Sequence, residues 1–262
     1  MEMLNVILIP ALIIGGIALL LGLILSIASL FFGVKPNEKE TAVRECLPGA
    51  NCGGCGFAGC DEYAKAIAEG KAEPNLCAPG GADTAKKISA VLGVNTEIKI
   101  KKAVVLCNGN SDNCDTSYNY IGSRSCNDAI SVLGGPKACK YGCIGFGDCV
   151  NACAFNALSI ENGKAKVNTD NCTGCGKCAN ICPKGIISLF EYPFKTINYC
   201  SNKDKGALAR KVCKTACIGC GICLKNCNFN AIKIENNKAE VITDNCTNCK
   251  ACVEKCPMHC IN

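Results

Sequence analysis

The first feature of the chain is a long apolar run near its start. Across residues 6–32 no side chain is charged, and Leu, Ile, Val and Ala fill most positions. A helix of about 20 apolar residues crosses the hydrocarbon core of a bilayer, and the opening residues lack the basic charges of a secretory signal. The pattern predicts a transmembrane anchor in residues 1–34. Because basic residues follow the run and none precedes it, we expect a single-pass protein of the inner membrane, with the remaining chain on the cytoplasmic side.

In the later part of the chain, apolar residues recur at the spacings of short helices and strands. Helical spacing of apolar residues covers 61–69 and 84–92, and a strand is expected over 98–106. Two similar stretches, 158–167 and 232–241, alternate apolar and polar residues around an Asn-Gly and an Asn-Asn pair, which is typical of β-hairpins. Helices and hairpins in separate segments predict an α+β fold.

The two hairpins belong to an internal repeat. A shift by 74 positions superimposes the cysteines of residues 126–182 on cysteines of residues 200–256. One position breaks the correspondence, because Phe146 stands where the second copy has Cys220. The C-terminal part of the chain therefore consists of two copies of one structural unit.

Cysteine gives this repeat its chemistry. The chain has 27 cysteines among 262 residues, and runs of the form Cys-x-x-Cys-x-x-Cys-x-x-x-Cys begin at Cys172, Cys217 and Cys246. Proline follows the first and third of these runs. Thiolates at this spacing hold iron–sulfur clusters in bacterial ferredoxins. The sequence therefore predicts a series of [4Fe-4S] clusters.

Two other uses of cysteine fit the sequence less well. A secreted disulfide framework also has a high cysteine content, but cysteines so close in the chain are badly placed to pair with each other, and their total is odd. A zinc site normally uses two cysteine pairs, whereas here a fourth cysteine follows each triplet. We therefore favour clusters over disulfides and zinc.

Ligand sets follow from a rule of two-cluster ferredoxins, in which the fourth cysteine of one run binds the cluster of the other run. For the second copy the rule predicts two sets: Cys217, Cys220, Cys223 and Cys256; and Cys227, Cys246, Cys249 and Cys252. For the first copy it predicts one complete set: Cys153, Cys172, Cys175 and Cys178. At the site that Phe146 leaves incomplete, we expect these four ligands: Cys139, Cys143, Cys149 and Cys182. An empty site or a three-iron cluster is the alternative there.

A separate glycine-rich segment supplies a fifth set. In residues 47–60 and 75–81 glycines and prolines surround cysteines, and such loops let backbone amides close around an anion. The expected ligands are Cys52, Cys55, Cys60 and Cys77. The Gly-x-Gly-x-x-Gly match at 54–59 contains a cysteine and has no expected strand before it, so we do not interpret it as a dinucleotide site.

Seven cysteines remain outside these five sets: Cys46, Cys107, Cys114, Cys126, Cys200, Cys213 and Cys260. Buried free thiols are one interpretation. The other is a sixth cluster, for which we expect Cys107, Cys114, Cys126 and Cys200. The predicted domains are then an anchor (1–34), a small [4Fe-4S] domain (35–96), a connecting segment (97–138) and two two-cluster ferredoxin-like units (139–190 and 191–262).

The order of these parts resembles the B subunits of the Rnf complex. The most specific similarity lies in residues 47–60, 75–81 and 137–149, and the resemblance covers essentially the whole chain. The chain resembles the longer form of these subunits, which is found in anaerobic bacteria. The shorter form has only one two-cluster unit, whereas two are predicted here. The resemblance implies a membrane assembly that couples electron flow from reduced ferredoxin to NAD+ with export of sodium ions or protons. The implied partners are soluble reduced ferredoxin and the other integral-membrane and flavin-bearing subunits.

The residues themselves limit what the chain does in such a complex. We find no phosphate loop, nicotinamide or flavin site, or acid–base pair in the sequence, and we expect an electron relay without substrate chemistry of its own. After residue 34 the chain carries 28 basic and 21 acidic side chains, and this balance of +7 suits an acidic protein partner. Nucleic acid is not expected, since there is no dense basic stripe and few aromatic side chains. Electron donation to another reductase or a redox regulator, and a structural metal scaffold, are the alternatives.

Overall fold

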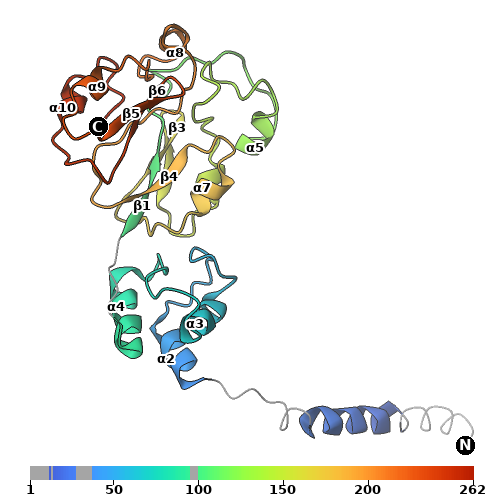
Figure 1. Ribbon diagram of the computed structural model, residues 1–262. Helices are drawn as coiled ribbons and strands as arrows, with labels where there is room; N and C mark the ends of the chain where they lie inside the picture. Colours follow the sequence, from blue (N-terminus) through green and yellow to red (C-terminus); the bar gives the residue numbers. More distant parts are fainter. Residues whose placement is uncertain (1–11, 13, 28–36, 95–99) are drawn as a thin grey trace, which may run out of the picture.

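Three helices form the small domain that precedes the repeat (Figure 1). The structure, a computed structural model, describes residues 12, 14–27, 37–94 and 100–262. The helices of the small domain are α2 (Glu38–Cys46), α3 (Cys60–Ala68) and α4 (Gly81–Leu92). Their apolar faces meet in a core that contains fully buried Tyr63 and Ile88. Helices α3 and α4 confirm the two helices expected from periodicity, with ends that differ by at most three residues.

Each copy of the repeat contains the expected β-hairpin. β2 (Leu158–Glu161) pairs antiparallel with β3 (Lys164–Val167), and β5 (Ile232–Glu235) pairs in the same way with β6 (Lys238–Val241). A tight two-residue turn of this kind requires positive φ angles. Four turn residues have them: Asn162, Gly163, Asn236 and Asn237. The hairpin prediction is confirmed for both copies.

A second strand pairing joins the end of each copy to the segment before it. β1 (Lys101–Val105) pairs antiparallel with β4 (Ile187–Glu191), and Val105 lies opposite Ile187. The second copy keeps a single bridge at the same place, between Asn198 and Ile261. β1 confirms the expected strand within the described residues. The connecting segment therefore packs as part of the first copy rather than as a loose linker.

Six short helices of the repeat are α5 (Cys126–Ala129), α6 (Asp148–Asn151), α7 (Lys177–Ile181), α8 (Gly206–Val212), α9 (Ile222–Lys225) and α10 (Ala251–Glu254). Four of them, α6, α7, α9 and α10, carry the third cysteine of a run or, in α6, its equivalent Cys149. A residue with a left-handed backbone directly precedes each of these four: Gly147, Gly176, Gly221 and Lys250. The sharp turn at these residues directs the cysteine of the first helical turn into the core: Cys149, Cys178, Cys223 and Cys252 are all buried.

Cysteines make up much of the core of the repeat. In the hydrophobic cluster of the second copy, 9 of the 15 buried residues are cysteines, whereas the small domain also has Tyr63, Ile67 and Ile88 in its core. The large apolar side chains buried in that cluster are Ile232, Met258 and Ile261. The spaces between the cysteines therefore decide what this part of the protein can hold.

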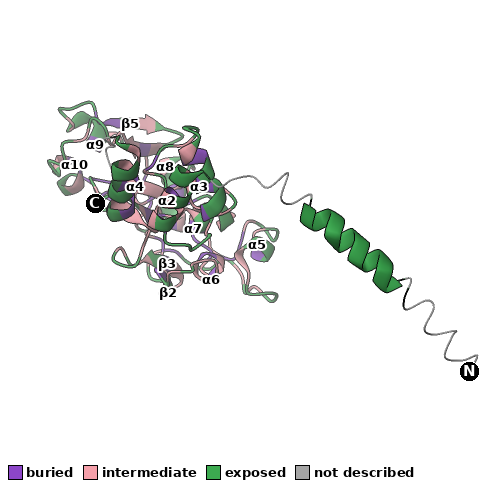
Figure 2. Cartoon of the chain, turned by 90° about the horizontal axis from the view of Figure 1, so that it is seen from below, coloured by how far each residue is buried: buried purple, intermediate pink, exposed green. Residues whose placement is uncertain are grey.

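The predicted transmembrane anchor is not supported. Residues 12 and 14–27 are helical and their side chains are exposed (Figure 2), but within the described residues no helix is both long and apolar enough to cross a membrane. The described helical run is shorter than the roughly 20 residues that a span requires, and the rest of the predicted anchor lies outside the described residues. We correct the fold class to α+β without the predicted transmembrane helix, and the single-pass inner-membrane localisation is corrected with it.

Candidate metal centres

The cysteines line small cavities. All 27 have free thiols. No group of three or more Cys, His, Asp or Glu side chains in the described ranges is arranged to hold a single metal ion, but five cavities are each lined by four or five cysteines. A single zinc ion would draw its sulfur ligands to about 2.3 Å from one point. A four-iron cluster fills more space and binds four thiolates around its edge, so its size and ligand number fit these cavities.

The small domain carries the first cavity. It is lined by the set expected from the sequence: Cys52, Cys55, Cys60 and Cys77. The Asn51 side chain accepts a hydrogen bond from the Cys60 N–H (2.8 Å), which fixes the cysteine loop at the start of α3. Tyr63 donates its hydroxyl to the Glu73 carbonyl (2.7 Å) and accepts from the Leu76 N–H (3.0 Å). Burial raises the pKa of Tyr63 to about 12, so it keeps its proton and holds the segment before Cys77 in place.

Two cavities in the repeat bring together the sets that the run rule predicts. One is lined by Cys153, Cys172, Cys175 and Cys178, and the other by Cys227, Cys246, Cys249 and Cys252. Backbone amides point at their sulfurs: the Ala103 N–H donates to Cys172 Sγ (3.3 Å) and the Ala157 N–H to Cys153 Sγ (3.4 Å). Such N–H donors favour the thiolate form that binds metal.

The other predicted set of the second copy is also close in space. Cys217, Cys223 and Cys256 are buried, whereas Cys220 is exposed. Burial raises the pKa of Cys223 to about 11, and the neighbouring Cys217, Cys220 and Cys256 thiolates add to the rise. Cys217, Cys223 and Cys256 therefore lie in one buried cluster, with Cys220 close to Cys223 at its exposed edge.

A fifth thiol, from Cys260, lies against this set. Cys260 is 1% exposed, and its Sγ lies 3.6 Å from the Sγ of Cys256. The Cys260 thiol has one hydrogen to share between two neighbours, and a hydrogen bond with it lowers the pKa of Cys217 to about 6 or that of Cys256 to about 5. The sequence did not predict that Cys260 lies beside this ligand set. The sequence signal for it is a difference between the copies, since the equivalent position of the first copy is Ile186.

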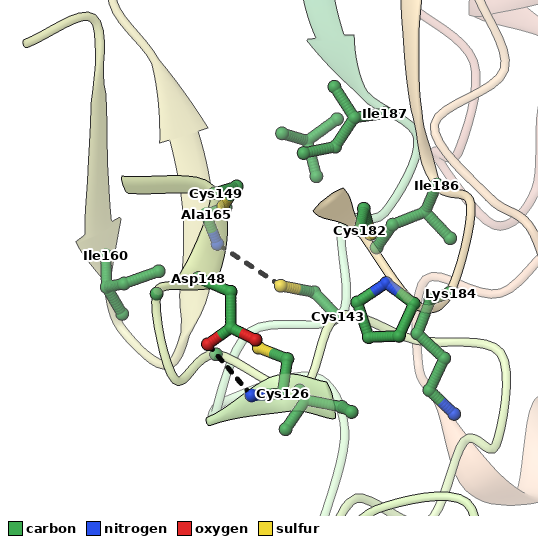
Figure 3. Close-up of a pocket in the computed structure, with 15 residues that line it drawn as sticks. Cys126, Cys143, Asp148, Cys149, Ile160, Ala165, Cys182, Lys184, Ile186 and Ile187 are labelled. Atoms are coloured by element: carbon green, nitrogen blue, oxygen red, sulfur yellow. Dashed lines mark hydrogen bonds between the residues drawn. The ribbon is translucent and has the colours of Figure 1, made fainter. Parts of the chain in front are cut away.

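The remaining site of the first copy has a different fourth cysteine from the one predicted. Its cavity is lined by Cys126, Cys143, Cys149 and Cys182 (Figure 3). The predicted Cys139 does not line this cavity. Cys126 reaches it from α5, and the Ala165 N–H donates to the sulfur of Cys143 (3.4 Å). The repeat thus supplies four cysteines here despite Phe146.

Asp148 explains why Cys126 can take this position. Its carboxylate accepts hydrogen bonds from the backbone N–H groups of Cys126 (3.0 Å) and Asn127 (3.1 Å) and from the Ser125 hydroxyl (3.1 Å). Burial alone would raise the pKa of Asp148, but these hydrogen bonds lower it below its ordinary value. Phe146 packs its ring 5.6 Å from that of Tyr120, in the loop that leads to α5. A contact between a loop and a helix start of this kind leaves no spacing pattern in the sequence.

Cys139 lines another cavity, between the two copies. Its cysteines are Cys107, Cys114, Cys139, Cys200 and Cys213. Of the expected sixth set, the structure brings Cys107, Cys114 and Cys200 together here and places Cys126 elsewhere.

The small-domain cavity lies against the first copy of the repeat. A Cβ added at Gly54 would lie 3.0 Å from the Cβ of Cys175 and 3.0 Å from its carbonyl oxygen. Cys55 lines the small-domain cavity, and Cys175 lines the cavity of the first copy. The absence of a side chain at Gly54 therefore permits close approach of the two sites.

Known protein families match the same three regions. The model of an Fe-S cluster family matches residues 47–79, and two different models of 4Fe-4S dicluster domains match residues 142–186 and residues 216–261. Together with the cysteine cavities, these matches define an iron–sulfur electron-transfer protein with [4Fe-4S] clusters.

Three relatives are similar over most of this chain. The B subunit of the Na(+)-translocating ferredoxin:NAD(+) oxidoreductase complex of Acetobacterium woodii is 44% identical, over 99% of this chain and 79% of the relative. The B subunit of the ion-translocating oxidoreductase complex of Methanosarcina acetivorans is 41% identical over 95% of both chains. The B subunit of the proton-translocating ferredoxin:NAD(+) oxidoreductase complex of Clostridium ljungdahlii is 39% identical, over 92% and 87%. The chain belongs to the family of B subunits of ion-translocating oxidoreductase (Rnf) complexes, and the predicted resemblance is confirmed.

Proposed function

We propose that this chain holds [4Fe-4S] clusters at five sites and passes single electrons from reduced soluble ferredoxin to flavin-bearing subunits of an ion-translocating ferredoxin:NAD+ oxidoreductase. Four of the proposed ligand sets are Cys52, Cys55, Cys60, Cys77; Cys153, Cys172, Cys175, Cys178; Cys217, Cys220, Cys223, Cys256; and Cys227, Cys246, Cys249, Cys252. The fifth is Cys126, Cys143, Cys149 and Cys182. When bound, each cluster supplies a centre that accepts and releases one electron.

The succession of cysteine sites along the molecule supports a relay. The small-domain site meets the Cys175 site at Gly54. The same cysteine run of the first copy then continues through α7 to Cys182, which lines the next cavity. The second copy repeats this arrangement. Short steps between neighbouring centres are what electron transfer through a protein requires, and a structural scaffold would not need them.

Reduction of NAD+ is assigned to other subunits. The glycine-rich stretch at 54–59 forms part of the cysteine loop before α3, and in the described residues 37–94 no strand precedes it, whereas a dinucleotide loop follows a strand. We also propose the domain division into 35–96, 97–138, 139–190 and 191–262. The three family matches support it, although strand β1 and Cys126 associate the connecting segment with the first copy.

Cys260 should set the reduction potential of one cluster without binding it. Hydrogen bonds to cluster sulfurs stabilise the reduced form and raise the potential. Cys260→Ala should therefore lower the midpoint potential of one cluster while iron content stays unchanged. A redox titration followed by electron paramagnetic resonance measures the shift, and Ile186→Cys should give the opposite shift at the first copy.

Cys220→Ala is the matched control, because it removes a proposed ligand of the same cluster. It should cost about four iron atoms per chain. If Cys260→Ala loses the iron and Cys220→Ala keeps it, the buried Cys260 is the ligand in place of the exposed Cys220, and the ligand set must be changed.

The proposed electron donor is tested by rapid mixing of reduced ferredoxin with the oxidised chain. The excess of basic side chains favours an acidic ferredoxin, and exposed charges are screened beyond about 10 Å at 0.1 M salt. Cluster reduction should therefore slow as ionic strength rises. If ferredoxin reduces no cluster at any salt concentration although dithionite reduces them, ferredoxin is not the donor. Clusters that dithionite cannot reduce reversibly would instead indicate a structural scaffold.

A further inference from the structure

The cavity between the two copies has no role in the five-site relay. The five cysteines that line it are each at most 9% exposed. Two come from the segment before the first copy, one from the first copy, and two from the second copy: Cys107 and Cys114; Cys139; and Cys200 and Cys213. No single sequence motif contains them, so the cavity exists only because the copies pack together.

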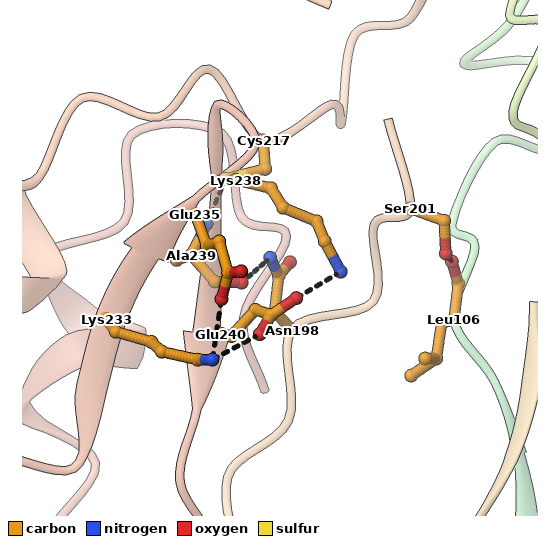
Figure 4. Close-up of polar contacts among 9 residues, drawn as sticks. All are labelled: Leu106, Asn198, Ser201, Cys217, Lys233, Glu235, Lys238, Ala239 and Glu240. Atoms are coloured by element: carbon orange, nitrogen blue, oxygen red, sulfur yellow. Dashed lines mark hydrogen bonds and ion pairs between the residues drawn. The ribbon is translucent and has the colours of Figure 1, made fainter. Parts of the chain in front are cut away.

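Hydrogen bonds between the flanking residues place Cys107 beside Cys200. The Asn108 N–H donates to the Tyr199 carbonyl (3.0 Å), and the Ser201 hydroxyl donates to the Leu106 carbonyl (2.9 Å; Figure 4). The two cysteines also occupy equivalent positions in the fold. Cys107 lies two residues after Val105, which pairs with Ile187 near the end of the first copy. Cys200 lies two residues after Asn198, which pairs with Ile261 near the end of the second copy.

The sulfurs of this pair each lie at a backbone amide of a cysteine in one of the proposed cluster sites. Cys107 Sγ accepts a hydrogen bond from the Cys143 N–H (3.4 Å), and Cys200 Sγ accepts one from the Cys217 N–H (3.1 Å). Cys143 and Cys217 belong to two of the five proposed cluster sites. The cavity therefore lies between a site of the first copy and a site of the second.

Backbone hydrogen bonds hold Cys114 between Cys139 and Cys213. On one side the Ala138 N–H, next to Cys139, donates to the Asp115 carbonyl (2.8 Å). On the other side the Lys214 N–H, next to Cys213, donates to the Asn113 carbonyl (2.8 Å). The residues on both sides of Cys114 are thus hydrogen-bonded to residues next to Cys139 and Cys213.

Three of the five side chains converge at Gly109. A Cβ added there would lie 3.5 Å from Cys107 Sγ, 3.6 Å from Cys213 Sγ and 3.3 Å from Cys114 Cβ. The fourth, Cys139, accepts a hydrogen bond to its sulfur from the buried Asn202 amide (3.3 Å). The Lys137 ammonium donates to the Gly109 carbonyl (2.6 Å), which places a positive charge beside the cavity. Amide donors and a cation are suitable surroundings for an anionic cluster.

We propose that Cys107, Cys114, Cys139 and Cys213 bind a sixth [4Fe-4S] cluster, which carries electrons between the two copies. Cys200 is the fifth thiol and remains unbound, because it is not among the three cysteine side chains that converge at Gly109. This set replaces Cys126 and Cys200 of the set expected from sequence with Cys139 and Cys213. A cluster held by these four cysteines would pass one electron at a time between the Cys143 site and the Cys217 site, with the electron supplied by reduced ferredoxin. The transfer role rests on the function proposed above, whereas iron binding does not.

Iron and sulfide analysis of variants tests the site. Cys114→Ala and Cys213→Ala should each lose about four iron atoms and four sulfides per chain, and the double variant should lose no more, because both act on one cluster. Cys200→Ala and Cys46→Ala should keep all their iron; Cys46 lies in α2 and its thiol bonds to the Ala42 carbonyl. Unchanged iron in Cys114→Ala, or loss in Cys200→Ala but not in Cys114→Ala, would overturn the ligand set.

The unmodified chain gives a second measurement that does not depend on the folding of a variant. After anaerobic reconstitution it should contain about 24 iron atoms rather than about 20, at four per cluster. A content of about 20 would overturn the sixth site. If the iron count is six clusters but ferredoxin reduces none of them, the site stands and the proposed donor fails.

Discussion

Replacement of Cys126 by alanine should remove one complete cluster, about four iron atoms and four sulfides per chain. The expectation follows from the cavity that Cys126 shares with Cys143, Cys149 and Cys182, although 17 positions separate it from Cys143 in the chain. A cluster with one thiolate missing exposes an iron to solvent and is readily lost. Iron and sulfide content, with a spin count by electron paramagnetic resonance after reduction, measures the effect.

Two further variants separate this assignment from the one expected from sequence. If Cys139 completed the Cys143 site, Cys126→Ala would keep its iron. The double change Cys126→Ala with Cys139→Ala should lose about eight iron atoms, because the two cysteines line different cavities. In the Cys126→Ala chain, Phe146→Cys should restore the four iron atoms, since it recreates the ordinary triplet spacing of the second copy.

Removal of all iron should unfold the repeat. Its helices have at most seven residues and its strands four or five, and cysteines form much of its core. Binding energies of about 10–16 kcal/mol for a structural metal are as large as the whole stability of a typical domain, about 5–15 kcal/mol. Because binding and folding are coupled, we expect residues 100–262 to lose fixed tertiary structure in the iron-free chain.

Hydrogen exchange resolved along the chain measures this collapse. Amides of the β1–β4 pair and of both hairpins should lose protection when iron is removed. Amides of α3 and α4 should lose less, because the small domain keeps a core of Val43, Tyr63, Ile67 and Ile88 without the cluster. Equal protection of the hairpins with and without iron would contradict the prediction and show that the repeat folds on its apolar contacts alone.

The sequence predicted local elements well because they depend on short spacing. The hairpins at 158–167 and 232–241 follow from alternation and turn residues, and the structure has them. The complete runs at Cys172 and Cys246 contribute three neighbouring cysteines each to the expected cavities. The transmembrane prediction for residues 6–32 was wrong. It depended on hydropathy alone, and the described residues do not support a membrane-spanning helix.

By itself, the sequence determined the repeat, the cysteine runs and the class of cofactor, because a triplet of thiols on one loop is set by the covalent chain. Where Phe146 interrupts the cysteine spacing, the tertiary structure alone decided which cysteine lies fourth in the cavity. Cys126 reaches its cavity because Asp148 binds the start of α5, and Cys139 lies between the copies because the neighbouring Ala138 is hydrogen-bonded to the segment of Cys114. These placements depend on contacts between segments far apart in the chain, and such contacts follow from packing geometry that residue spacing does not record.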